Sequence, residues 1–278
     1  MKARLLPFNR LPSETHRELR SRLDQFYGAA TGYTAFQSPS NKRAYWDHVL
    51  GFIGGRLVHA ANAKVKVLEI GAGRSGFGHY LRERGLRDAV EYHAQDVTRY
   101  NEEWLKNEAD LSFFGDILST ALPQGYDIIF STYVLEHVTN PPDHLEKIWS
   151  LLADGEKAGE MFIFAPRYDI PGYICPSARH LPASQQLEFV LKACWARLLT
   201  LFLRKPQFLI QTDLAAFHGP FSTDADAVHW VSLHDLRIWA ISHKASFTTL
   251  RIGNPAFLSR DWVLKRFCTT ALQISKPK

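Results

Sequence analysis

The chain has 278 residues, of which 46% are hydrophobic and 22% charged, so it can bury a full core in one large domain. Its three cysteines, Cys175, Cys194 and Cys268, are far apart, which excludes a disulfide framework and a paired-cysteine zinc site and favours a reducing cytoplasm. No segment reaches the ~20 apolar residues of a membrane span. The net charge of +5 comes from interspersed Lys and Arg, which disfavours a specific nucleic-acid partner.

The first 64 residues predict a helical leader that packs on the main domain. After the polar start Ser40-Asn41, apolar residues recur at helical spacing: Tyr45, Trp46, Val49, Leu50, Ile53, Leu57 and Val58. From Val65 the pattern changes to short apolar runs that alternate with helical or polar connections. These runs cover residues 65–70, 89–94, 111–114, 126–131 and 161–165. The alternation predicts a parallel sheet covered by helices on both faces.

Residues 167–228 interrupt this rhythm with several prolines and one long apolar helix, and we interpret them as an insertion. Beyond it, Ser232 and Asp235 resemble a capping box that opens a helix through His243. Two late strands are expected at 246–252 and 267–274. The main domain is therefore predicted to span residues 65–278.

A glycine turn follows the first strand of this domain. Gly71, Gly73 and Gly76 form a GxGxxG arrangement, a helix is expected over residues 75–84, and Asp96 lies 20 residues beyond the last glycine. Such a turn lets a nucleotide-type cofactor approach the backbone. NAD and S-adenosylmethionine both remain open on this pattern.

The charge of the surrounding residues favours S-adenosylmethionine. A dinucleotide brings a pyrophosphate that nearby carboxylates repel, whereas S-adenosylmethionine carries a sulfonium and an ammonium. The chain places Glu69, Asp96 and Asp116 at the ends of three successive strands. Three carboxylates at these positions suit a cationic cofactor.

These motifs together resemble the class I S-adenosylmethionine-dependent methyltransferases, in particular a small-molecule group of the type 11 and 12 kind with a Glu-His pair after the fourth strand. The likeness spans residues 64–166 and resumes near 228–253. The matching residues are Val67-Leu-Glu-Ile-Gly-Ala-Gly73, Gln95-Asp96, Gly115-Asp116-Ile117, Tyr126 to His137, and Leu151-Leu-Ala-Asp-Gly155 leading into 161–166. The resemblance implies a Rossmann-like α/β fold: a doubly wound, seven-stranded, mostly parallel sheet with an antiparallel last strand, to which the leader and a lid-like insertion are added.

The resemblance also implies a set of cofactor-binding residues. Glu69 and the backbone of Gly71, Ala72 and Gly73 would hold the methionine end, Asp96 with Val97 beside it the ribose, Asp116 with Ile117 the adenine, and Ser131 the floor near the methyl group.

His137 is the candidate catalytic residue, because a hydroxyl acceptor benefits from a nearby proton acceptor and this histidine follows the fourth strand. A structural or cofactor-shaping role for the Glu-His pair is the favoured alternative, since the resemblance places the pair in relatives with different substrates. His180, His218 and His229 lie in or just after the insertion, where surface positions are expected. No metal site is predicted, since His229 and His234 have the wrong spacing for one helical face.

Asn140-Pro-Pro-Asp143 superficially matches a motif of DNA-adenine methyltransferases but lacks the aromatic residue, so a helix cap is the preferred interpretation.

The apolar helix over residues 186–204 is interpreted first as a lid over the acceptor, with a homodimer contact and a peripheral membrane contact as alternatives. The expected reaction is methylation of an oxygen, or less readily a nitrogen, on a small-molecule, saccharide-like or lipid-linked acceptor. The alternatives are an NAD-dependent oxidoreductase and a non-catalytic module that retains the fold. The expected location is the cytoplasm, with the surface of the inner membrane as a second option.

Overall fold

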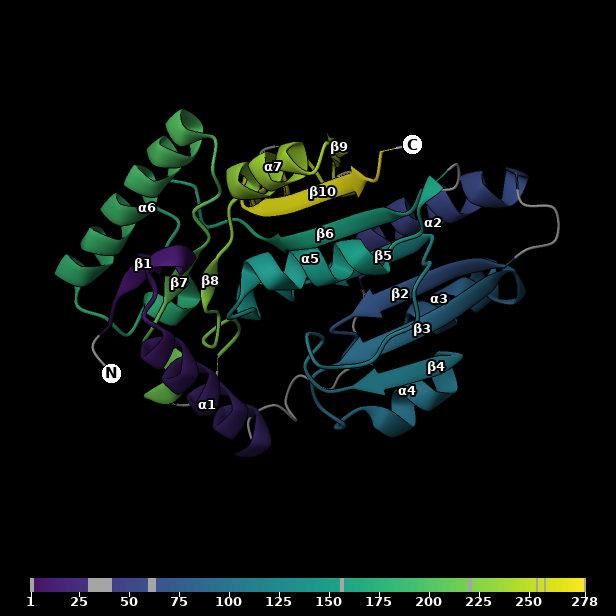
Figure 1. Cartoon of the computed structure of the whole chain (residues 1–278), viewed down its shortest axis with the longest axis horizontal. Helices are drawn as coiled ribbons and strands as arrows, with labels where there is room; N and C mark the ends of the chain where they lie inside the picture. Colours follow the sequence, from purple (N-terminus) through teal and green to yellow (C-terminus); the bar gives the residue numbers. More distant parts are fainter. Residues whose placement is uncertain are drawn as a thin grey trace.

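The computed structural model describes residues 3–29, 42–59, 64–155, 158–219, 222–253, 255–257 and 259–277. Its main element is a seven-stranded sheet of order β4-β3-β2-β5-β6-β10-β9 (Figure 1). The strands are β2 (Val65–Ile70), β3 (Val90–Asp96), β4 (Leu111–Phe114), β5 (Ile128–Thr132), β6 (Glu160–Pro166), β9 (Ser246–Thr249) and β10 (Thr269–Ser275). The first five are parallel, and β10 is antiparallel to both of its neighbours. The predicted fold class is confirmed.

Helices cover both faces of this sheet, because successive residues of a buried strand point to opposite sides. Val67 of β2 packs with helices α2 (Arg43–His59), α3 (Phe77–Glu83) and α4 (Glu102–Glu108). Leu68, the next residue, packs with α5 (Pro141–Leu151) and α7 (Leu233–Ser242). The helix α8 (Arg260–Phe267) has no buried residue. No helix within the described residues is long and apolar enough to cross a membrane.

A second sheet joins the start of the chain to the region 167–228. The strand β1 (Leu5–Pro7) pairs antiparallel with β7 (Leu209–Gln211), and β7 pairs with β8 (His229–Trp230). The sequence predicted only helical structure for residues 1–64, so a strand at 5–7 is a correction. Its three residues are too few to show a periodic pattern, and only the distant β7 satisfies their backbone groups.

Two further helices flank this small sheet, α1 (Ser13–Ala29) and α6 (Ala183–Leu203). Figure 1 shows both on the side of the molecule that carries β1, β7 and β8. One face of α6 is buried against the chain, through Phe189, Ala193, Ala196, Arg197 and Thr200.

The helix caps were predictable from the sequence in part. Asn140 accepts a hydrogen bond from the backbone of Asp143 at 3.2 Å, which confirms the cap at α5. Ser232 caps α7 as expected, accepting from the backbone of Asp235. The Asp235 carboxylate, however, turns inward to the buried guanidinium of Arg197 at 2.6 Å, so the reciprocal half of the capping box is replaced by a buried ion pair.

Candidate active site

The glycine turn after β2 has the geometry that a close ligand approach requires. Gly71 and Gly73 adopt left-handed φ values of 61° and 56°, which L side chains rarely tolerate. A Cβ added at Gly71 would lie 2.4 Å from the Val134 side chain, so only glycine fits there. The turn therefore exposes bare backbone at the carboxyl end of β2.

The carboxylates after β3 and β4 lie at this same edge of the sheet. Asp96 Oδ2 accepts a hydrogen bond from the Gly73 backbone at 2.6 Å, and its other oxygen accepts from Thr98. Asp116 accepts from the Leu118 backbone at 3.0 Å and also meets the Arg20 guanidinium. Burial raises the pKa of Asp96 above its usual value, against the hydrogen bonds that favour its ionised form.

A cavity of about 230 Å³ opens between this edge and helix α1. Residues of the sheet edge form one wall: Gly71, Gly73, Asp96, Val97, Asp116, Ile117 and His137 among others. Four residues of α1 form the opposite wall: Arg20, Leu23, Asp24 and Tyr27. The helical leader thus covers the cavity, and no residue of α6 is among the described residues that line it.

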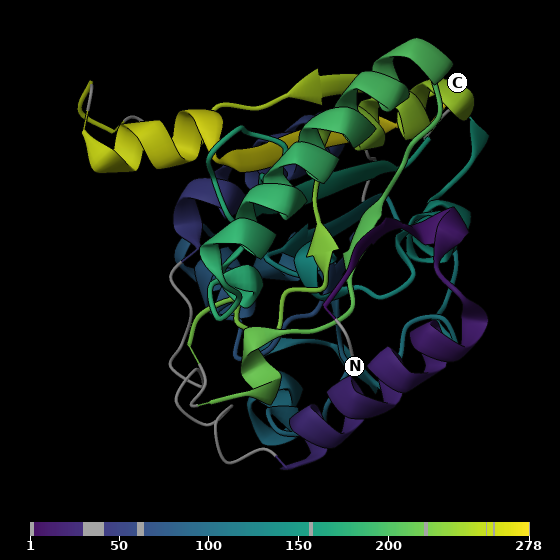
Figure 2. The ribbon, with the colours of Figure 1, turned by 90° about the vertical axis from the view of Figure 1, so that its left-hand side faces the viewer.

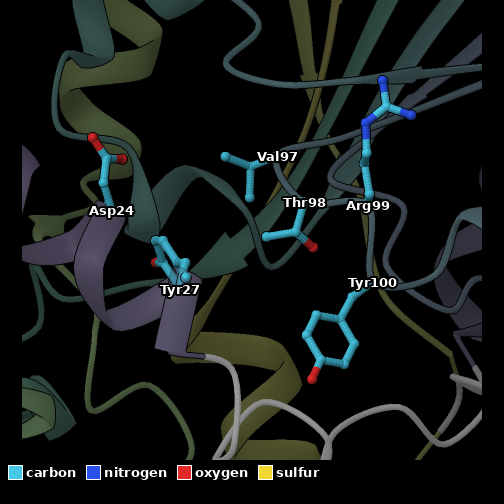
Figure 3. A pocket seen from close by; sticks show the side chains of 7 residues that line it. Asp24, Tyr27, Val97, Thr98, Arg99 and Tyr100 are labelled. Atoms are coloured by element: carbon cyan, nitrogen blue, oxygen red, sulfur yellow. The ribbon is translucent and has the colours of Figure 1, made fainter.

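An open pocket of about 550 Å³ continues the cavity outward. Figure 3 shows Asp24 and Tyr27 of α1 facing Val97 and Thr98 across it, with Arg99 and Tyr100 farther along the same loop. The first four of these residues also line the inner cavity. A ligand at the sheet edge therefore has a path to solvent past α1.

Three of the predicted cofactor residues lie outside the described wall of the cavity: Glu69, Ala72 and Ser131. Glu69 is buried, and the Tyr92 hydroxyl donates to its Oε2 at 2.6 Å. Burial raises the pKa of Glu69 to about 7, although the nearby Lys42 cation opposes the shift. Lys42 donates to the backbone oxygen of Thr132 at 2.9 Å, at the end of β5. The methionine end of the predicted site thus contains a buried acid balanced by a cation.

A second group of ionisable side chains surrounds His137, in the short helix η4 (Leu135–His137). The His137 Nδ1 lies 3.2 Å from Asp226 Oδ2, and its Nε2 lies 3.9 Å from Glu136 Oε1. Tyr27 donates to the same Asp226 oxygen at 2.9 Å. Asp224 has a carboxylate oxygen within 4.8 Å of the Glu136 and His137 atoms. Residues far apart in sequence therefore form one charged cluster at the cavity.

Within this cluster, Glu136 is fully buried and neither of its oxygens has a hydrogen bond to a described residue. Burial raises its pKa to about 8, despite the opposing charge of His137. For His137, burial alone would lower the pKa, but the carboxylates of Asp226, Glu136 and Asp224 outweigh it and raise the pKa to about 10. Near neutral pH the cluster therefore combines an imidazolium with a carboxyl group poised to titrate.

The backbone around η4 holds this cluster in place. Tyr133 has a left-handed φ of 60°, and its hydroxyl lies 2.5 Å from that of Tyr45. The Val228 backbone donates to the backbone oxygen of Glu136 at 2.8 Å, and the His229 Nδ1 lies 3.0 Å from the backbone oxygen of Leu135. The segment before α7 thus anchors η4 and delivers Asp224 and Asp226 to it.

Sequence reasoning missed the contributions of α1, Lys42, Asp224 and Asp226 to this site. Asp224 and Asp226 lie at the end of the predicted insertion, where nothing in their spacing connects them to His137. His229, interpreted as a loop residue, is instead fully buried. His180 and His218 lie together at another place, in contact with Asp213.

The groups that line the cavity fit the groups of S-adenosylmethionine. Its wall offers bare backbone at Gly71 and Gly73 and two carboxylates, Asp96 and Asp116, that can accept hydrogen bonds. The buried acid Glu69 lies behind the turn. The exposed backbone of the glycine turn and the carboxylates together match a cofactor that has hydroxyls, an amine and a sulfonium but no phosphate.

Several solved structures to which this chain is similar are described as methyltransferases. The plantazolicin methyltransferase BpumL in complex with SAH aligns with 98% of this chain and 93% of its own, at 13% identity and a TM-score of 0.47. An S-adenosylmethionine-dependent methyltransferase from Mesorhizobium loti aligns with 84% of this chain and 98% of its own, at 12% identity and 0.49. CurJ carbon methyltransferase aligns at 14% identity and 0.46, and this chain spans 50% of its length.

None of the curated proteins matches the chain in sequence. A family model described as a methyltransferase domain, however, matches residues 22–185, more than half of the chain. The match includes the last eight residues of α1, the glycine turn, Asp96, Asp116 and His137. The chain belongs to this methyltransferase family and is an S-adenosylmethionine-dependent enzyme of class I.

Proposed function

We propose that the enzyme methylates a hydroxyl oxygen of a saccharide-like or lipid-linked acceptor. The observation that carries the proposal is Glu136, a fully buried carboxyl group without a hydrogen bond to any described residue, beside the cavity residue His137. A buried carboxylate without a hydrogen bond is costly, so one beside the cavity is a candidate for proton transfer.

Bound S-adenosylmethionine would supply an activated methyl group, held by the glycine turn, Asp96 and Asp116. The chain's task is then to align the acceptor oxygen and to remove its proton as the new carbon–oxygen bond forms. We assign that proton to Glu136, whose pKa of about 8 lies nearer to neutral pH than that of His137. Glu136 lies behind the cavity residue His137, so the proton would reach it by way of the imidazole, which gives up one proton as it takes another. His137, held by Asp226, stays protonated and stabilises the negative charge that develops on the acceptor oxygen.

The test of this chemistry is the Glu136→Gln variant. Its side chain has the same shape but cannot accept a proton, so we expect kcat to fall about 100-fold or more while the affinity for S-adenosylhomocysteine stays the same. In the wild type the ionised fraction of Glu136 grows about tenfold from pH 7 to pH 9, so kcat should rise over this range. A variant that keeps wild-type kcat and the same pH profile would refute the assignment.

The acceptor atom is identified separately. The protein is incubated with S-adenosylmethionine carrying a labelled methyl group and a fractionated cell extract, and the labelled product is located by mass spectrometry and NMR. We expect the label on oxygen. Label on nitrogen or carbon would contradict the proposed reaction but leave the cofactor site intact.

The lipid-linked acceptor is supported by the outer face of α6. Its exposed residues are mostly apolar: Leu187, Leu191, Trp195, Leu198, Leu201, Phe202 and Leu203. Ser184 and Glu188 are the exposed polar residues of the helix. Arg204 and Lys205 follow directly at its end. Figure 2 shows α6 crossing the front of the view, with this side of the molecule turned outward. An apolar helical face next to cations suits an anionic membrane surface, where a lipid-linked acceptor would be found.

Vesicle cosedimentation tests this contact. We expect binding to vesicles that contain anionic lipid, and its loss in Leu191→Lys/Phe202→Lys. Val58→Lys, at a comparably exposed apolar position on α2, is the matched control and should bind as the wild type does. Equal binding of all three proteins, or a stable dimer that α6 substitutions disrupt, would overturn the membrane assignment.

A further inference from the structure

A cluster of metal-ligating side chains lies outside the cavity. His180 comes shortly after η6 (Pro176–Ala178), Asp213 follows β7, and His218 follows η7 (Ala215–Phe217). The His180 Nε2 lies 3.3 Å from Asp213 Oδ2, and the His218 Nε2 lies 2.9 Å from both Asp213 oxygens. None of the three is among the described residues that line the cavity. Two imidazoles thus converge on one nearly buried carboxylate.

The orientation of His180 indicates that its Nε2 presents a lone pair. Its Nδ1 lies 2.9 Å from the backbone oxygen of Ser177, and a carbonyl oxygen only accepts, so Nδ1 carries the proton. In the neutral ring the unprotonated Nε2 then faces a carboxylate oxygen of Asp213, and two lone pairs repel. A positive charge between them removes this conflict, as it does for ligating histidines whose other nitrogen donates to a carbonyl.

The two rings lie face to face at the carboxylate. The rings of His180 and His218 are stacked, with centroids 4.8 Å apart and an angle of 23°, and this stacking holds both Nε2 atoms at Asp213. The Arg22 guanidinium of α1 lies 3.6 Å from Asp213 Oδ1, on the same carboxylate. A single cation shared by both Nε2 atoms and the carboxylate satisfies all three groups at once.

The ligands are also held by a buried scaffold. Gln211 is fully buried, and its Nε2 donates to the backbone oxygens of Ser177 at 3.0 Å and Asp213 at 2.6 Å. This side chain therefore links the loop of His180 to that of Asp213. Such second-layer hydrogen bonds orient ligands in metal sites.

We propose that His180, Asp213 and His218 bind one divalent transition-metal ion, Zn²⁺ in preference, with the remaining coordination left to water. Two imidazole nitrogens and one carboxylate oxygen suit this class of ion, whereas Mg²⁺ and Ca²⁺ prefer oxygen ligands alone. The site joins the loops around β7 and, through Arg22, helix α1, so its role is structural. It departs from the sequence-based prediction of no metal, which rested on the spacing of His229 and His234 and on the lack of a cysteine or paired carboxylate to complete a ligand set.

The test titrates ZnCl₂ into tag-free protein that has been stripped of metal with a chelator. Calorimetry should give one ion per chain with a Kd below about 1 µM, and Zn²⁺ should raise the Tm. We expect His180→Ala and His218→Ala each to weaken binding about 100-fold. With Co²⁺ in place of Zn²⁺, the wild type should show the visible absorption of a Co²⁺ ion with a low coordination number, and both variants should lack this absorption.

His79→Ala is the control, since the exposed His79 side chain pairs with Glu83 at 3.1 Å and no third described residue completes a metal site there. This variant should bind Zn²⁺ as the wild type does. His218 is 46% exposed, so its substitution should leave the metal-free Tm unchanged and separates loss of binding from loss of folding. Zn²⁺ binding weaker than about 100 µM, or equally tight binding by all variants, would overturn the proposal.

Discussion

His229 makes the stability of this enzyme sensitive to acid. The side chain is fully buried, its Nδ1 donates to Leu135 at 3.0 Å, and its Nε2 has no hydrogen bond to a described residue. Burial lowers the pKa of His229 to about 4 from its ordinary value of 6.5. The folded protein therefore binds fewer protons here than the unfolded chain between pH 4 and 6.5. Stability that is present above pH 6.5 is lost as the pH falls toward 4.

The size of this effect follows from the two pKa values. A shift of about 2.5 units corresponds to about 3.4 kcal/mol once the pH is below both values, and about 2 kcal/mol of this is lost by pH 5. His229→Asn keeps a donor for the Leu135 oxygen but does not titrate. The smaller side chain should cost about 1–2 kcal/mol at every pH through the cavity it leaves.

Urea unfolding at pH 7.5 and pH 5 measures both the stability lost through protonation of His229 and the cost of the smaller side chain. The free energy of unfolding of the wild type should fall between these pH values by about 2 kcal/mol more than that of His229→Asn. His79→Asn, at an exposed position, should follow the wild type. Identical pH dependence in the wild type and His229→Asn would refute the argument that a neutral, buried His229 anchors η4.

Two further predictions concern the glycine turn and the buried ion pair. Gly71→Ala should lower the affinity for S-adenosylhomocysteine about tenfold or more, because the new methyl group displaces Val134. Gly85→Ala is the control, since Gly85 has a similar φ of 66° but open space around it. It should lower the free energy of unfolding by about 1 kcal/mol through backbone strain and leave the affinity unchanged. Arg197→Met should lower the free energy of unfolding by about 3–5 kcal/mol, because it leaves the buried Asp235 carboxylate without a countercharge; a loss below about 1 kcal/mol would contradict this.

Much of the fold could be predicted because its local signals are strong. All seven strands of the large sheet lie where the apolar runs predicted them, within two or three residues at their ends. The caps at Asn140 and Ser232 are equally local. The small sheet could not be predicted, since β1 and β8 have three and two residues and depend on pairing with β7.

The site shows the same division between local and distant information. The order of Gly71, Gly73, Asp96 and Asp116 along the chain predicted one wall of the cavity, because the ends of parallel strands meet at one edge. The other wall comes from α1, and the partner of His137 is Asp226. These contacts depend on how the predicted insertion folds back, which no periodicity encodes.

The pairing of β1 with β7 delays the formation of the small sheet while the chain is being synthesised. Leu6 and Ile210 pair across about 200 residues of chain, so at about 5–20 residues per second the ribosome delivers β7 roughly 10–40 s after β1. During that interval β1 has no partner strand, and the cavity wall on α1 cannot yet be anchored through Arg22 and Tyr27 to Asp213 and Asp226. The cofactor cavity is therefore completed late, after both ends of the small sheet have left the ribosome.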